Sequence, residues 1–124
     1  MRKMERKEVL IWLRQAQHDI EVARYNLEGN MLDASAFYSQ QAAEKALKSV
    51  YILKFRKLWK IHDLVKLARE INATSKIIKL CAKINPVYTA VRYPDIEELN
   101  KKDVKEIFNA SKEVLAWVKK KLKL

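Results

Sequence analysis

Residues 34–55 form a helix-prone stretch that places polar and aromatic side chains on the same side. One helical face is small and apolar, comprising Ala42, Ala43, Ala46, Leu47, Val50 and Leu53. The opposite face carries Phe37, Tyr38, Gln41, Glu44, Lys45, Lys48 and Phe55. An ordinary surface helix buries its aromatics and keeps its charges on the other side. The mixed face therefore predicts the wall of a polar pocket; the alternatives are a dimer surface or a solvated face with lysine stems over the aromatic rings.

A second candidate is the tetrapeptide Arg92-Tyr93-Pro94-Asp95. The planar fork of an arginine matches carboxylates and phosphates, and a proline fixes the turn from which Tyr93 and Asp95 project. These residues fit a ligand site opposite the mixed face. The alternative is a structural salt bridge from Arg92 to Glu44 or Asp19.

The pair His62-Asp63 supports two interpretations. A histidine at a helix start could transfer a proton or contact a phosphate, and Arg56 precedes it by six residues, which allows a nuclease-like Arg-His pair. In the structural interpretation, Asp63 caps the next helix. Both residues are candidate ligand contacts, and Arg56 with His62 is the weaker, catalytic alternative.

Composition excludes several functional classes. The 124 residues include one glycine, so no glycine-rich phosphate loop is available. A single cysteine and two histidines give no metal-binding spacing, and we expect neither a metal nor a cofactor. Neither a signal-peptide pattern nor a membrane-length apolar run is present, which predicts a cytoplasmic protein. Abundant Lys, Glu and Ile fit a thermophile.

The net charge of +11 favours an anionic partner such as nucleic acid, a nucleotide phosphate or an acidic protein, with plain solubility as the alternative. On the last predicted helix, one row of lysines is either a solvated face or a phosphate-binding stripe. The row comprises Lys105, Lys112, Lys119 and Lys123.

The elements that must position these residues are helices. With one glycine and two prolines, the chain lacks the turn residues that sheets need. The first helix carries a stripe at spacings of four and three, and Gly29 is expected as its C′ residue. Asn30 or Asp33 would cap the second helix, from about 33 to 55. Shorter helices begin near His62 and at Thr74 or Ser75, and Asn85 would cap a further turn through Val91.

The last helix is expected over about 101–122. The apolar positions of the first and last helices are Val9, Leu13, Ala16, Ile20, Ala23 and Leu27, and Val104, Phe108, Ser111, Leu115, Val118 and Leu122. The sequence predicts a single domain, residues 1–124, folded as an all-α, up-and-down bundle of four to five helices.

Taken in order, these segments resemble the HEPN (higher eukaryotes and prokaryotes nucleotide-binding) domain family. The resemblance includes the first helix around Ala16–Ala23, with its alanines and Asp19, and the segment Ala36–Lys48. It continues through His62-Asp63-Leu64 and closes with the pattern from Asn85 through Tyr88 to Arg92-Tyr93-Pro94-Asp95. It implies a helical bundle, often a homodimer, that associates with nucleotides or nucleic acid.

The resemblance also implies a partner minimal nucleotidyltransferase, often in a toxin–antitoxin pair. Many HEPN members are metal-independent RNases that use a late Arg-x4–6-His motif, but no histidine follows Arg92 here. We therefore expect a non-catalytic module that binds a nucleotide, nucleic acid or the partner enzyme. An RNase using Arg56 and His62 is the first alternative, and a basic dimerisation or scaffold module is the second.

Overall fold

A computed structural model describes residues 3–90 and 99–123, and within these ranges it contains helices and turns but no strand. The helices are α1 (Lys3–Glu28), α2 (Leu32–Phe55), α3 (Leu64–Glu70), α4 (Ser75–Ile84), α5 (Val87–Ala90) and α6 (Lys101–Lys121). The all-α bundle is thus confirmed, with α5 as a short extra turn whose predicted end, Val91, lies outside the described residues.

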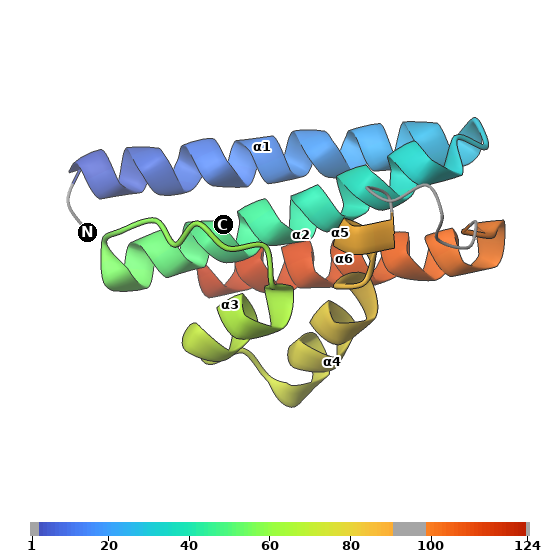
Figure 1. Cartoon of the computed structure of the whole chain (residues 1–124). Helices are drawn as coiled ribbons and strands as arrows, with labels where there is room; N and C mark the ends of the chain where they lie inside the picture. Colours follow the sequence, from blue (N-terminus) through green and yellow to red (C-terminus); the bar gives the residue numbers. More distant parts are fainter. Residues whose placement is uncertain (1–2, 91–98, 124) are drawn as a thin grey trace.

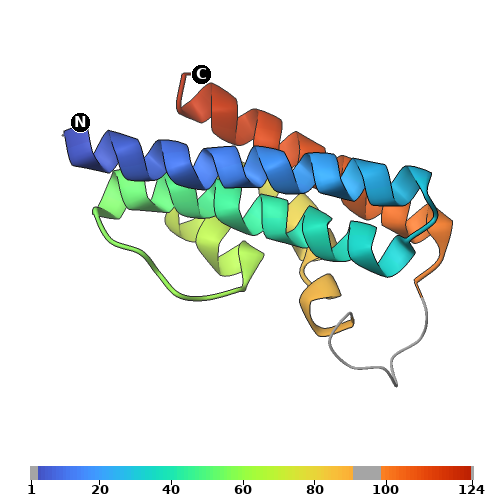
Figure 2. The same cartoon turned by 90° about the horizontal axis from the view of Figure 1, so that it is seen from above.

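Three long helices make the body of the molecule. α1 and α2 form an antiparallel hairpin, and α6 packs alongside both, running in the same direction as α2 (Figure 1). α3 and α4 form a smaller pair against the α2–α6 side. The first turn of α1 and the last turns of α2 and α6 consequently lie at the same end of the bundle (Figure 2).

The α1–α2 hairpin is close-packed because small residues line it. Ala16 and Ala23 of α1 and Ala42, Ala43 and Ala46 of α2 are completely buried. The remaining predicted stripe residues of α1 are buried or, for Leu27, packed against the core. A buried large aliphatic side chain contributes roughly 1.5–3 kcal/mol. The alanines bring the two helices near enough for side chains on both to share the polar contacts described below.

The α1–α2 connection differs from the prediction. Asn30, not Gly29, takes the left-handed conformation, with φ 59°. The amide of Met31 donates to the carbonyl of Asn26 at 2.8 Å, and that of Asn30 to Leu27 at 3.2 Å, which is a Schellman arrangement with Asn30 at C′. Met31 precedes α2 without a side-chain cap, so neither Asn30 nor Asp33 is its N-cap. Asparagine tolerates this conformation better than most residues.

The shorter helices bury the predicted residues. Leu64, Leu67, Ala68 and Ile71 are buried, as are Ile77, Cys81 and Ile84, with Leu80 partly buried. Thr74 caps α4, its hydroxyl accepting from the amide of Ile77 at 3.3 Å. Both α3 and α5 contact α2, beside the polar residues on that helix.

α6 completes the core with its predicted stripe. Val104, Phe108, Ser111, Leu115 and Val118 are buried, and Leu122 packs against them. The hydroxyl of Ser111 donates to the backbone carbonyl of Ser39 at 2.6 Å, which joins α6 to α2. On the outer side, Lys105, Lys112 and Lys123 are exposed and Lys119 is partly buried.

Candidate functional site

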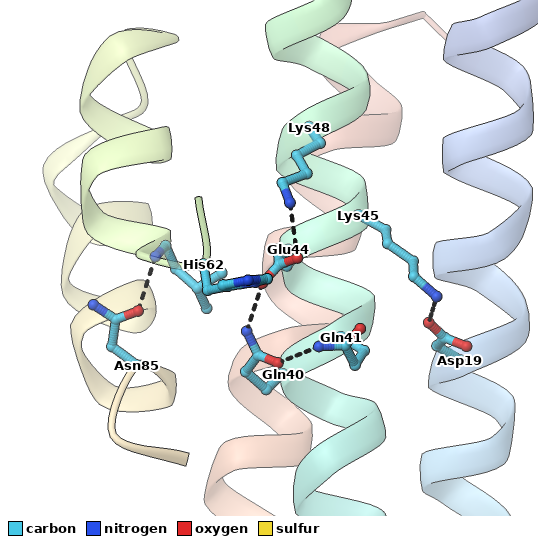
Figure 3. A network of polar contacts seen from close by, with 9 residues as sticks. Asp19, Gln40, Gln41, Glu44, Lys45, Lys48, His62 and Asn85 are labelled. Carbon is cyan, nitrogen blue, oxygen red and sulfur yellow. Dashed lines mark hydrogen bonds and ion pairs between the residues drawn. The ribbon is translucent and has the colours of Figure 1, made fainter. Parts of the chain in front are cut away.

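The carboxylate of Glu44, midway along α2, is the centre of a polar cluster. One oxygen, Oε1, accepts from Gln40 Nε2 at 3.1 Å and lies 3.0 Å from His62 Nδ1. The other, Oε2, accepts from Lys48 Nζ at 2.9 Å (Figure 3). Gln40, Glu44 and Lys48 are each four residues apart, so one turn of helix separates them. These three residues and His62 are called the Glu44 cluster below.

The three α2 residues of the Glu44 cluster lie under the protein surface. Glu44 and Lys48 are each only 4% exposed. The alternative of a solvated face is therefore wrong for these two residues, while Tyr38, Gln41 and Lys45 are half-buried. Lys48 Nζ also lies 5.8 Å from the ring centroid of Trp12 on α1. Removing one member of a buried ion pair leaves an uncompensated charge and costs about 3–5 kcal/mol.

His62 is the exposed member of the Glu44 cluster. Its side chain is 48% exposed, and its ring stacks on Tyr88 of α5 with 4.4 Å between centroids and 16° between planes. A carboxylate only accepts hydrogen bonds, so the Nδ1 that faces Glu44 carries a proton. Nε2 is then the nitrogen that can accept a hydrogen bond from a ligand, or donate one when the ring is protonated.

Asp63 fixes the backbone next to His62. It is the N-cap of α3, and its Oδ1 accepts from the amides of Val65 and Lys66 at 3.0 and 3.2 Å. Asn85 donates its amide to the same oxygen at 2.9 Å and accepts from the amide of Leu64 at 2.8 Å. The hydrogen bond from Asn85 is the largest cause of a lowered Asp63 pKa. Asp63 thus has the predicted capping role, and Asn85 serves α3, not the predicted cap of α5.

A second ion pair extends the site toward α1. Lys45 Nζ lies 2.6 Å from Asp19 Oδ2, and Asp19 is 4% exposed. Gln41 donates to Gln40 Oε1 at 2.7 Å, which connects the α2 face near Lys45 with the Glu44 cluster. The structure therefore brings Glu44, Lys48 and His62 together and links Gln41 to them through Gln40, whereas Lys45 is directed to Asp19 on α1 (Figure 3). Asp19 and Glu44, the two predicted acceptors for Arg92, are already bonded to other cations.

Other predicted residues lie apart from this cluster or outside the described part of the chain. Tyr38 meets Phe37 edge-on, with 5.2 Å between the ring centroids. Arg56 follows the end of α2 in a left-handed conformation, twelve residues beyond Glu44, or about 18 Å along the helix at 1.5 Å per residue. That separation exceeds an arginine side chain, so Arg56 and His62 are not brought together. Arg92, Tyr93 and Asp95 lie outside the described residues.

Two residues of the site, Gln40 and Tyr88, were missed among the sequence candidates. Gln40 could have been found, because it lies one helical turn before Glu44. Tyr88 belongs to the family pattern but was not a site candidate, since its stacking on His62 depends on how α5 packs against α2. Among the described residues, no group of three or more His, Cys, Asp or Glu side chains is arranged to hold a metal ion. No helix in residues 3–90 and 99–123 is long and apolar enough to cross a membrane.

The fold and the site define a small helical bundle with a buried polar cluster on its second long helix. The HEPN domain family matches residues 9–121, and the chain belongs to that family. A protein of Methanocaldococcus jannaschii named "Putative toxin MJ1304" is 29% identical, over 91% of this chain and 87% of that protein. The resemblance noted in the sequence is therefore confirmed.

Two solved structures share the fold. The crystal structure of ST0689, an archaeal HEPN homologue, matches with a TM-score of 0.78 and 30% identity, covering 92% of this chain and 97% of that one. The structure of TT1696 from Thermus thermophilus matches with a TM-score of 0.82 over 92% and 98% of the two chains. At 22% identity, this similarity shows only that the two chains share a fold.

Proposed function

We propose that this chain is a non-catalytic HEPN module that binds a nucleotide at the Glu44 cluster. The observation that carries the proposal is a buried Glu44–Lys48 ion pair beneath a half-exposed His62 ring. Apolar residues of similar volume would stabilise a fold as well as a buried ion pair does, or better. The buried charged pair on α2 is therefore a candidate for function.

Each group in the cluster has a role in this proposal. Glu44 orients Lys48 and His62 through its two oxygens. His62 Nε2 contacts the phosphate or base, and the ring of Tyr88 supports the imidazole from one face. Lys45, half-buried beside Asp19, supplies a second cation. Arg92, Tyr93 and Asp95 are proposed to complete the site, with Arg92 on phosphate and Tyr93 stacked on a base or sugar.

Calorimetric titration with ATP, GTP and their diphosphates tests the nucleotide site. The chain offers a matched control, because its other histidine, His18, is exposed on α1. We expect His62→Ala to weaken binding at least tenfold and His18→Ala to leave it unchanged. Equal affinities for the two variants would place the nucleotide elsewhere.

A minimal nucleotidyltransferase is the proposed protein partner, in a pair of the toxin–antitoxin kind, acting in the cytoplasm. Membership of the HEPN family and the named toxin from M. jannaschii support this part. Co-expression with a nucleotidyltransferase encoded beside this chain should give a complex that survives gel filtration. If the two proteins elute separately and no nucleotide binds, the proposed function has no remaining support.

Ribonuclease activity is the second candidate, favoured by one contact. Glu44 holds His62 by Nδ1 and leaves Nε2 to act, which is how a carboxylate orients a catalytic histidine. The distance from Arg56 means that another arginine would have to assist. Cleavage of a labelled RNA by the wild type but not by His62→Ala, with His18→Ala as control, would establish it. Equal cleavage by all three proteins would trace the activity to a contaminant or another site.

The molar mass of the protein in solution shows whether the proposed homodimer forms. Analytical ultracentrifugation should give twice the 14.6 kDa of one chain if the proposed dimer forms. A dimer that binds neither nucleotide nor partner would support the scaffold role.

A further inference from the structure

The two ring nitrogens of His62 have different surroundings. Nδ1 lies 3.0 Å from Oε1 of the buried Glu44 side chain (Figure 3). Glu44 also accepts from Gln40 and Lys48, so its carboxylate is an acceptor surrounded by donors. Nδ1 therefore keeps its proton in the neutral ring as well as in the cationic ring. A change in the protonation of His62 takes place at Nε2.

The orientation of the His62 ring is held by neighbours on two further elements. Tyr88 of α5 stacks on the ring with 16° between the two planes. Asp63, the next residue along the chain, is anchored through one oxygen to the first amides of α3 and to the side chain of Asn85. These contacts keep Nδ1 directed to Glu44, so a ligand meets the imidazole through Nε2.

The proton on Nε2 sets the charge of the Glu44 cluster. The carboxylate of Glu44 and the ammonium of Lys48 are 2.9 Å apart and almost wholly buried, and their charges cancel. The cluster is therefore neutral when His62 is neutral and carries one positive charge when the ring is protonated. Asp63 and Tyr88 are the other titratable groups beside the ring. Their charges are the same in both states of His62, so the difference of one unit remains.

The two states of Nε2 select opposite ligand groups. The neutral ring presents a lone pair, which accepts from an N–H or O–H group and repels the oxygens of a phosphate. The protonated ring presents an N–H and a positive charge, and such a charge-assisted hydrogen bond to an anionic oxygen is roughly twice as strong as a neutral one. An unconstrained imidazole can donate from either nitrogen without taking up a proton. The contact with Glu44 removes that choice for His62.

We propose that a phosphate binds at the Glu44 cluster with the uptake of one proton by His62, and that Glu44 sets this specificity through the histidine. The inference rests on the proposed nucleotide site and adds the condition under which a phosphate occupies it. Because the anion binds the protonated ring, its affinity falls about tenfold for each pH unit above the pH at which the ring titrates. A nucleoside without phosphate offers donors of its base and sugar, contacts the neutral ring and needs no proton.

Calorimetry with ATP and with adenosine tests the proton uptake. Between about pH 7.5 and 9 the charge of ATP is constant, because the second ionisation of a phosphate lies near pH 6, so a change in affinity reports on the protein. The heats in two buffers of different ionisation enthalpy give the number of protons bound. Above the pH at which the NMR signals of His62 titrate, we expect about one proton per ATP and none per adenosine. His18→Ala, at an exposed position on α1, should keep this difference.

The outcomes of this experiment separate the inference from the proposed function. ATP that binds with constant affinity and no proton uptake would overturn the inference and leave the nucleotide site standing. Equal proton uptake with adenosine would also overturn it, because the proton would then not depend on the phosphate. If ATP binds at no pH between about 6 and 9, the range in which histidines titrate, both fail.

A double variant, Glu44→Gln with Lys48→Met, tests the role of Glu44 and leaves neither buried charge unpaired. An amide can donate or accept, so a neutral His62 ring can then donate from Nε2, and the ATP affinity should change less than about threefold per pH unit. Nitrogen chemical shifts of the ring, measured without ligand, provide an independent test. The neutral ring should carry its proton on Nδ1 in the wild type and on either nitrogen in the variant. A neutral wild-type ring protonated on Nε2, or equal pH dependence in the two proteins, would overturn the inference.

Discussion

Lys48 Nζ lies 2.9 Å from Glu44 Oε2 of the same helix, α2, and both side chains are almost wholly buried. An exposed pair at this spacing would be worth a few tenths of a kcal/mol. Burial changes the consequence of losing either partner, because the charge that remains cannot be hydrated. Losing one partner alone should therefore destabilise the fold strongly, and the pair is also the foundation of the proposed site.

Lys48→Met should lower the free energy of unfolding by about 3–5 kcal/mol, since it leaves the Glu44 carboxylate buried without its lysine. Adding Glu44→Gln removes the stranded charge and should recover most of the loss. Urea denaturation measures both. As a control, Lys83→Met breaks the half-exposed pair with Glu106 and should change stability by less than about 0.5 kcal/mol. A double variant no more stable than Lys48→Met would contradict this account.

The connection between α1 and α2 should depend on Asn30. Asn30→Ala places an ordinary side chain at φ 59° and should cost about 1 kcal/mol, whereas Asn30→Gly should be neutral or stabilising. Asn109→Ala, at an exposed position inside α6, should not destabilise. Thermal unfolding of the three variants measures the difference. Equal melting temperatures for Asn30→Ala and Asn30→Gly would show that the Schellman arrangement does not contribute.

Protonation of Asp63 should make the protein less stable in acid. Because its folded-state pKa is lowered from 3.8, chiefly by Asn85, the carboxylate contributes stability above the unfolded pKa. That contribution is lost as the pH falls through the lowered value. Asp63→Asn keeps a capping oxygen but does not titrate, so its stability should fall less steeply between about pH 5 and pH 2. Parallel pH profiles for wild type and variant would rule out the linkage.

The thiol of Cys81 should be inert in the folded protein. Burial, with a smaller contribution from the charge of Asp63, raises the pKa of Cys81 to about 12. The thiolate is the reactive form, so little is present at about pH 8. An aromatic disulfide reagent should label Cys81 in urea but not in native buffer. Rapid labelling under native conditions would show that α4 opens readily.

Periodicity was enough to predict the helices and their buried faces, from Val9–Leu27 on α1 to Val104–Leu122 on α6. It failed at the α1–α2 connection, because Gly29 and Asn30 both tolerate a left-handed conformation and the choice depends on where the last hydrogen bonds form. The mixed face of α2 made Glu44 a site candidate, and the structure places it among Gln40, Lys48 and His62. Its burial was not predictable, since His62, which contacts it, and Tyr88, which stacks on His62, come from segments that are distant in the sequence. For the same reason, the spacing of Arg56 and His62 suggested a pair that the path of the chain separates.

The most direct test of the central claim, a nucleotide site at the Glu44 cluster, is an NMR titration of the two histidine rings. The chain has only His18 and His62, so each imidazole signal can be assigned with one substitution. Adding nucleotide to millimolar concentration should shift the ring signals of His62 in a saturable manner and leave those of His18 in place. If His62 does not move, or if both rings shift together in proportion to added salt, the Glu44 cluster is not a nucleotide site.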